Sequence, residues 1–152
     1  MYKSKKVLIL APHTDDGEFG CGGSISRFLE NDNEIFYVAV STAKESVPKG
    51  LPPDILEKEV KEATKRLGIY KDNLIILHFT VRKLNYYRQE ILEKLVKIKN
   101  EIEPDIVLLP SPNDLHQDHY TVSMEGQRAF KQTSILAYEI PWNNINFQTQ
   151  AF

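Results

Sequence analysis

The sequence predicts an α/β fold: a three-layer sandwich around a mostly parallel sheet of about five strands. Two observations predict it. Apolar runs without polar alternation are typical of strands covered on both faces, and amphipathic segments at helical spacing lie between these runs. Strands that alternate with helices imply right-handed crossovers, which place helices on both faces of the sheet. The chain of 152 residues shows no internal repeat, so we expect one domain over residues 1–152.

The first half of the chain is predicted to hold three strands and two helices. The expected strands are the apolar runs at residues 7–11, 35–40 and 74–79. A first helix is expected over residues 24–30, where apolar side chains share one face. A second is expected over residues 54–67, because Asp54 suits the N-cap and Gly68 supplies a stop.

The second half is predicted to add two helices and two strands. A long amphipathic helix is expected over residues 85–102, followed by a buried strand over residues 105–109. The polar loop at residues 111–118 leads into a helix that ends near residue 131, and a fifth strand is expected over residues 135–140. The tail after this strand shows no clear period.

Composition excludes several classes of protein. Nineteen basic against twenty-one acidic residues give a formal charge of -2, which lacks the basic field of a nucleic-acid binder. The single cysteine, Cys21, cannot form an internal disulfide. No apolar run approaches the roughly 20 residues that span a bilayer, and the N-terminus lacks the features of a signal peptide. We therefore expect a cytoplasmic protein without a membrane span, for which a homo-oligomer is an open option.

The side chains that could bind a metal or transfer a proton lie mainly in two loops. Residues 12–16 follow the first expected strand and read Pro-His-Thr-Asp-Asp, and residues 114–119 follow the fourth and read Asp-Leu-His-Gln-Asp-His. Ligands bind outside the carboxyl ends of strands in such sheets. Three of the four histidines fall in these loops, so we expect both loops to form one site.

The spacing within the loops suits a metal. His13 and Asp16 are three residues apart, as are His116 and His119, and such pairs can share one side of a helical turn. Two imidazoles and a carboxylate make the ligand set of a catalytic zinc with one position open for water. Without a thiolate, Fe²⁺ also fits this set. The spacing leaves open which of His116 and His119 binds the ion.

The remaining acidic residues of the loops then have distinct functions. Asp15 can take a proton from a metal-activated water as general base, and Asp118 can orient an imidazole by a hydrogen bond. The histidine that does not bind the metal can stabilise an oxyanion when protonated. Taken singly, the Asp15-Asp16 pair would most often be a turn or a helix N-cap. The cluster His116-x-Asp118-His119, taken singly, is as compatible with the start of a surface helix as with a site. Their conjunction favours hydrolysis of an amide or ester.

Two other motifs carry less weight. Gly20-x-Gly22 lacks the third glycine of a dinucleotide-binding loop, since Ile25 stands there, so its glycines are interpreted as points of close backbone approach. Cys21 stands at an expected helix start, where a thiolate would be stabilised, but we interpret it as a packed thiol.

Both loops resemble the signatures of a known family. Residues 11–23 resemble the (A/P)HPDDE-x-x-G-x-GG signature of the PIG-L/LmbE-like zinc-dependent N-acetylglucosaminyl deacetylases, and residues 114–119 resemble their HxDH motif. The resemblance implies a Rossmann-like fold, a zinc ion and removal of the N-acetyl group from an N-acetylglucosamine-type small molecule or glycoconjugate. A deacetylase of a non-sugar amide and a catalytically weak carbohydrate-binding module are the alternatives.

The resemblance also assigns roles to residues. It implies that the metal ligands are His13, Asp16 and His119. It further implies that Asp15 is the general base and that His116 stabilises the oxyanion, protonates the leaving amine and is oriented by Asp118.

The chain departs from the family pattern at several positions. Thr14 replaces a proline, Gly17 stands where the family has glutamate, and Leu56 stands where it has an arginine that contacts sugar. Substrate contacts are therefore expected from Lys44, Arg82 or Arg88. Family members are usually longer, so we expect this chain to lack their C-terminal portion.

Overall fold

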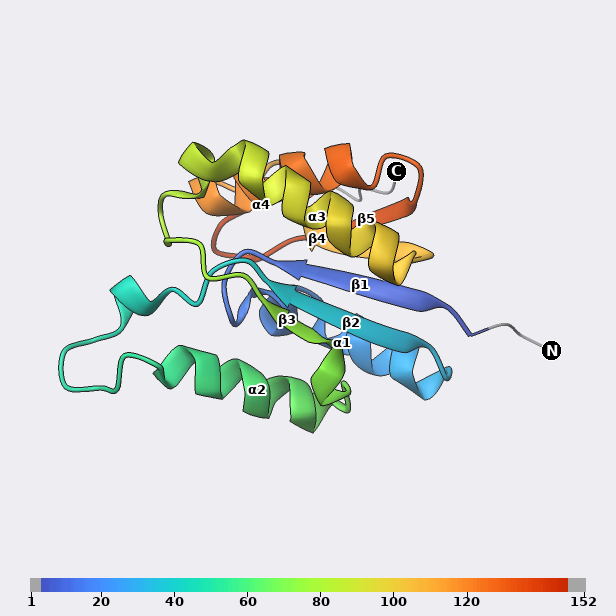
Figure 1. Ribbon diagram of the computed structural model, residues 1–152, viewed down its shortest axis with the longest axis horizontal. Helices are drawn as coiled ribbons and strands as arrows, with labels where there is room; N and C mark the ends of the chain where they lie inside the picture. Colours follow the sequence, from blue (N-terminus) through green and yellow to red (C-terminus); the bar gives the residue numbers. More distant parts are fainter. Residues whose placement is uncertain (1–3, 148–152) are drawn as a thin grey trace.

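The computed structural model describes residues 4–147, and these form one parallel sheet with helices on both faces (Figure 1). Residues 1–3 and 148–152, which include the end of the predicted tail, lie outside the described residues. The strands follow the order β3-β2-β1-β4-β5. They are β1 (Lys6–Ala11), β2 (Glu34–Ala39), β3 (Leu74–Ile76), β4 (Ile106–Pro110) and β5 (Ser134–Tyr138). The predicted fold class is confirmed.

Four helices connect these strands, and they cover the two faces in pairs. They are α1 (Asp16–Glu30), α2 (Ile55–Leu67), α3 (Arg88–Ile102) and α4 (Gln117–Ala129). One core cluster joins α3 and α4 to one face through Ile91, Leu95 and Val122. The other joins α1 and α2 to the opposite face through Ile25 and Val60. Figure 1 shows the first pair above the sheet and the second below it.

Helix α1 is longer than the sequence predicts. It begins at Asp16 rather than near residue 24 and includes a glycine-rich stretch, and it is kinked at Cys21, whose φ of −145° and ψ of 22° are not helical. Glycine weakens an isolated helix, but here it allows close packing. A Cβ atom at Gly17 would lie 2.6 Å from the ring of Tyr37, and one at Gly20 would lie 2.2 Å from Cδ2 of Tyr138. The first turns of α1 therefore lie directly on two tyrosine rings, and this packing outweighs low helix propensity.

Smaller differences occur elsewhere. Strand β3 ends at Ile76, three residues before the predicted end at residue 79. Residues Leu84–Tyr87 form a 3₁₀ turn before α3, which replaces the first residues of the helix predicted over residues 85–102. Within residues 4–147, no helix is both long enough and apolar enough to cross a membrane.

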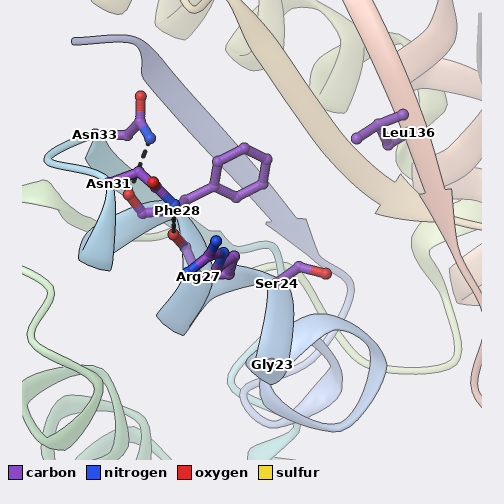
Figure 2. Close-up of a pocket in the computed structure, with 7 residues that line it drawn as sticks. All are labelled: Gly23, Ser24, Arg27, Phe28, Asn31, Asn33 and Leu136. Atoms are coloured by element: carbon purple, nitrogen blue, oxygen red, sulfur yellow. Dashed lines mark hydrogen bonds between the residues drawn. The ribbon is translucent and has the colours of Figure 1, made fainter.

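A groove of about 470 Å³ lies between α1 and the edge strand β5 (Figure 2). Gly23, Ser24 and Phe28 line it on the side of α1, and Leu136 of β5, which is 39% exposed, lies across from them. Its described lining contains no histidine and no carboxylate, so this groove is distinct from the site that the sequence predicts.

Candidate metal centre

The two predicted loops meet at the carboxyl ends of the adjacent strands β1 and β4. His13 follows β1, and Asp16 is the first residue of α1. His116 is the N-cap of α4, and His119 lies in its first turn. The site is thus built from two helix starts that lie side by side, although about a hundred residues separate them in the chain.

Three side-chain atoms converge at this point. Nδ1 of His13 lies 3.0 Å from Oδ2 of Asp16, and Nε2 of His119 lies 3.2 Å from the same oxygen. The two nitrogens are 3.3 Å apart. A tetrahedral ion with bonds of about 2.0–2.1 Å separates its ligand atoms by about 3.3 Å. The separations of these three atoms are therefore compatible with one divalent metal ion.

A second combination of ligands is also compact. Three histidines, His13, His116 and His119, each offer one ring nitrogen, and these three nitrogens lie within 4.8 Å of one another. The ring of His116 stacks on that of His119 at a centroid distance of 4.6 Å. However, Nδ1 of His116 accepts a hydrogen bond from the backbone N–H of Asp118 at 3.1 Å, which leaves only Nε2 for a metal. The shorter separations favour the set that contains Asp16.

Two buried carboxylates orient the candidate ligands. Nε2 of His13 contacts Oδ2 of Asp118 at 3.0 Å, and Nδ1 of His119 contacts Oδ2 of Asp114 at 2.8 Å. Each histidine therefore turns its other nitrogen toward Asp16. Such partners fix the tautomer and the ring orientation of a metal ligand.

The role of Asp118 differs from the one that the resemblance implies. Its carboxylate contacts His13, and only its backbone N–H contacts His116. The same carboxylate accepts the backbone N–H groups of Arg82 at 2.6 Å and Leu84 at 3.2 Å. Sequence reasoning assigned no role to Asp114. The signal that could have found it is an acidic residue directly after a strand, in the same loop as the histidines.

The charges of the cluster stabilise one another. Burial opposes ionisation of Asp16, but hydrogen bonds from His119 and His13 hold the pKa of this carboxyl well below its usual range. Burial opposes protonation of His13, but its contacts with Asp118 and Asp16 raise its pKa to about 9. Contacts with Asp114 and Asp16 likewise outweigh burial and raise the pKa of His119 to about 9. Protonated His13 and His119 therefore stabilise the ionised carboxylate of Asp16.

The two residues beside the ligands behave differently. The pKa of Asp15 is raised, because partial burial and the charge of Asp16 oppose its ionisation more strongly than its own backbone N–H favours it. The pKa of His116 is lowered, because burial and the charges of His119 and His13 oppose its protonation. Protonation is therefore easier for Asp15 than for a free aspartate, and harder for His116 than for a free histidine.

The remaining predicted residues lie around this centre or away from it. The guanidinium of Arg88 donates from Nε to Oε1 of the buried Glu125 at 2.6 Å. Arg82 contributes its backbone to the site, and its side chain is exposed, as is that of Lys44. The substrate contacts of all three stay predictions. Cys21 is packed as predicted: burial raises the pKa of its thiol to about 12.

Comparisons with known proteins show the family of this chain. Residues 8–130 match the profile of the family described as PIG-L: GlcNAc-PI de-N-acetylase. This chain belongs to the PIG-L family. The prediction made from the two loop motifs is confirmed.

Relatives of this PIG-L chain include proteins named as deacetylases. It is 30% identical to the uncharacterized deacetylase YaiS of Escherichia coli over 99% of this chain and 82% of YaiS. It is 29% identical to the diacetylchitobiose deacetylase of Thermococcus kodakarensis over 88% of this chain and 55% of that protein.

A solved structure shows the same fold. The N,N'-diacetylchitobiose deacetylase of Pyrococcus horikoshii, bound to its inhibitor MPG, superposes with a TM-score of 0.80 at 25% identity, over 90% of this chain and 61% of that chain. The chain therefore spans little more than half the length of the two named diacetylchitobiose deacetylases.

Proposed function

We propose that this chain is a metal-dependent hydrolase that removes the N-acetyl group from an N-acetylglucosamine-type substrate. The observation that carries the proposal is the triangle of ligand atoms from His13, Asp16 and His119, with the carboxylate of Asp15 directly beside it in the chain. Membership of the PIG-L family and the two deacetylase relatives support the choice of an acetamido group.

His13, Asp16 and His119 would hold the ion, with Zn²⁺ as the proposed metal and Fe²⁺ as a second ion that suits the same ligands. When bound, a divalent ion acidifies a water and polarises the acetyl carbonyl. The orienting contacts of Asp118 and Asp114 keep the two imidazoles in place for this ion.

Asp15 is the proposed general base. Its carboxylate takes a proton from the attacking water, whose oxygen forms the new bond to the acetyl carbon. The carbon–nitrogen bond then breaks, and the nitrogen receives a proton, which leaves a free amine and acetate. The carboxyl of Asp15 holds the proton taken from the water between the two steps and returns it to the nitrogen.

His116 is the proposed donor to the developing oxyanion. Its Nδ1 accepts the backbone N–H of Asp118, so the neutral ring carries its hydrogen on Nε2. A neutral His116 can therefore donate a hydrogen bond to the carbonyl oxygen without the protonation that sequence reasoning assumed. Its lowered pKa agrees with this neutral form.

Arg82 is the best-placed of the proposed substrate contacts, because its backbone is fixed by Asp118 at the site. Lys44 and Arg88 stand as weaker proposals, and Arg88 already pairs with Glu125. A cytoplasmic location is proposed as well.

Acetate release from N-acetylglucosamine and diacetylchitobiose by the Zn²⁺-loaded chain tests the proposed function. The matched variant is Asp15→Asn, which keeps the size of the side chain. We expect this variant to keep its metal while kcat falls by roughly 10²–10⁴-fold, the usual contribution of a general base. Unchanged kcat would refute the assignment of the base. Binding of the sugars without acetate release in the wild type would favour a carbohydrate-binding module instead.

A further inference from the structure

The start of helix α1 is capped by a side chain from outside the helix. The first backbone N–H groups of a helix have no acceptor within the helix, and the N-cap side chain normally accepts from the second or third of them. Asp15 is the N-cap of α1, and aspartate is among the best residues for this task. Within the described chain, however, the Asp15 side chain makes no capping hydrogen bond.

A tyrosine from a neighbouring strand supplies the missing acceptor. Tyr37 of β2 is fully buried, and its hydroxyl oxygen accepts the N–H of Gly17, the second residue of α1, at 3.2 Å. The same hydroxyl donates its hydrogen to Oε2 of Glu18. One phenol therefore uses its acceptor and its donor on successive residues of the first turn.

Gly17 makes this approach feasible. A Cβ atom at this position would lie 2.6 Å from both Cε2 and the hydroxyl oxygen of Tyr37. Such a separation is far below van der Waals contact, so any larger residue would push the phenol away from the helix. The glycine and the tyrosine thus fit each other at the point where the helix begins.

Glu18 is likewise kept from capping. It is the third residue of α1, where a glutamate commonly reaches back to the backbone N–H of the N-cap in a capping box. Here its carboxylate accepts from Tyr37 instead. The sequence Asp15-x-x-Glu18 has the spacing of a capping box. Tyr37, however, binds the carboxylate of Glu18 and accepts the N–H of Gly17 that the carboxylate of Asp15 could have accepted.

We propose that Tyr37 is a positioning residue that keeps the Asp15 carboxylate off its own helix and so available to the reacting water. The inference rests on the proposed function, in which Asp15 is the general base. Tyr37 acts through Asp15: it occupies the N–H of Gly17 that Asp15 would otherwise bind, and it has no contact with the candidate metal ligands among its described hydrogen bonds.

The variant Tyr37→Phe tests the proposal, because it keeps the ring and removes only the hydroxyl. Once the N–H of Gly17 loses its partner, the Asp15 carboxylate is expected to turn onto it. We expect kcat to fall by roughly tenfold or more, a part of the full contribution of a general base. KM and the metal content should remain within about twofold of the wild type, since neither depends on Asp15 in this mechanism.

Tyr138→Phe is the matched control. Tyr138 is also buried under α1, where its ring lies against Gly20, but its hydroxyl donates to the carbonyl of Leu10 at 2.9 Å and not to the helix start. This variant loses one buried hydrogen bond, whereas Tyr37→Phe loses two, so its melting temperature should fall by less than that of Tyr37→Phe. Its kcat should stay at the wild-type value.

A double-mutant cycle separates positioning from general structural damage. In the Asp15→Asn background, Tyr37→Phe should lower kcat by less than about twofold, because the group through which it acts is already gone. The proposal is overturned if Tyr37→Phe keeps wild-type kcat, if its full effect persists in the Asp15→Asn background, or if Tyr138→Phe lowers kcat equally.

A crystal structure of Tyr37→Phe gives a readout that does not depend on activity. We expect a carboxylate oxygen of Asp15 within hydrogen-bond distance of the Gly17 nitrogen. An unchanged Asp15 side chain would overturn the inference even if the chain proved to be a deacetylase. If the wild type releases no acetate, the proposed function fails, and this structure still decides whether Tyr37 controls the orientation of Asp15.

Discussion

The two helix starts that form the site differ in the side chain that caps them: α4 is capped by its own N-cap residue, and α1 by a residue of another strand. In α4 the N-cap residue His116 accepts the N–H of Asp118 with its own Nδ1. In α1 the N-cap residue Asp15 makes no such bond, and Tyr37 from β2 accepts the N–H of Gly17. His116 therefore retains one ring nitrogen for chemistry, whereas Asp15 keeps its carboxylate clear of the helix. The comparison shows that a side chain from a neighbouring strand can take over the capping of a helix start.

The surroundings of the two helix starts also differ. The start of α4 is held by buried acids: Asp114 and Asp118 are 5% and 0% exposed, and both contact candidate ligands. The start of α1 is held by packing of its glycines on two tyrosine rings. Substitutions near α4 should therefore change charge and metal affinity, whereas substitutions under α1 should change geometry and stability.

The largest expected effect concerns the cap of α4. His116→Ala removes both the cap and the proposed oxyanion donor, so kcat should fall by roughly 10²–10³-fold, and the free energy of unfolding should fall by about 1 kcal/mol. His116→Asn should restore the stability, because asparagine caps well, but not kcat. Denaturant unfolding and acetate release measure the two quantities. Recovery of kcat with asparagine would show that the imidazole serves only as a cap.

The next effect concerns the acids that orient the ligands. Asp114→Asn and Asp118→Asn should each weaken metal binding by roughly 10–100-fold, which is typical for loss of such a partner. Asp118→Asn should also destabilise the fold, because its carboxylate accepts two backbone N–H groups from residues 82 and 84. Competition titration with a chromogenic chelator measures the affinity. Equal affinity in both variants and the wild type would contradict the orienting role.

A third effect is a dependence of stability on pH in the metal-free chain. The pKa values of His13 and His119 are raised to about 9, above the usual value of about 6.5 in an unfolded chain. Their contribution is therefore complete below pH 6.5 and is lost as the pH rises through 9, on the order of 3 kcal/mol for each histidine taken alone. The melting temperature with chelator should fall across this range, and the increase caused by Zn²⁺ should grow. A flat or rising melting temperature with chelator would contradict these pKa values.

The smallest effects come from the glycines of α1. Gly20→Ala should destabilise the chain by about 1–3 kcal/mol, because its Cβ would lie 2.2 Å from Tyr138. At Gly23 an added Cβ meets no atom of the described residues within 4 Å, so Gly23→Ala should stabilise the helix by up to about 1 kcal/mol. Urea unfolding of both variants measures the difference. A similar change in both would show that helix propensity, and not tyrosine packing, controls this stretch.

Much of this architecture could be predicted from the sequence, because the strands are continuous apolar runs and the polar loops follow them. The start of α1 could not be predicted, since the low helix propensity of its glycines is offset by packing on Tyr37 and Tyr138, which come from distant strands. For the same reason, Tyr37 looked like an ordinary core residue.

Within the site, spacing predicted which loops meet but not which partner orients which ring. Asp118 is adjacent to His119 and two residues from His116, yet its carboxylate contacts His13, which is 105 residues away. Asp114 was missed because its contact with His119 depends on how the loop after β4 turns. The partner of a side-chain hydrogen bond depends on how the folded chain places the side chains, and residue spacing along the chain does not determine it.

The metal content of four proteins tests the central assertion, that His13, Asp16 and His119 bind one divalent ion between the two helix starts. After loading with Zn²⁺ and desalting, elemental analysis should find about one equivalent in the wild type and in His116→Ala. His13→Ala and His119→Ala should each lose most of it. A full equivalent in either of these two variants, or its loss in His116→Ala, would contradict the assignment.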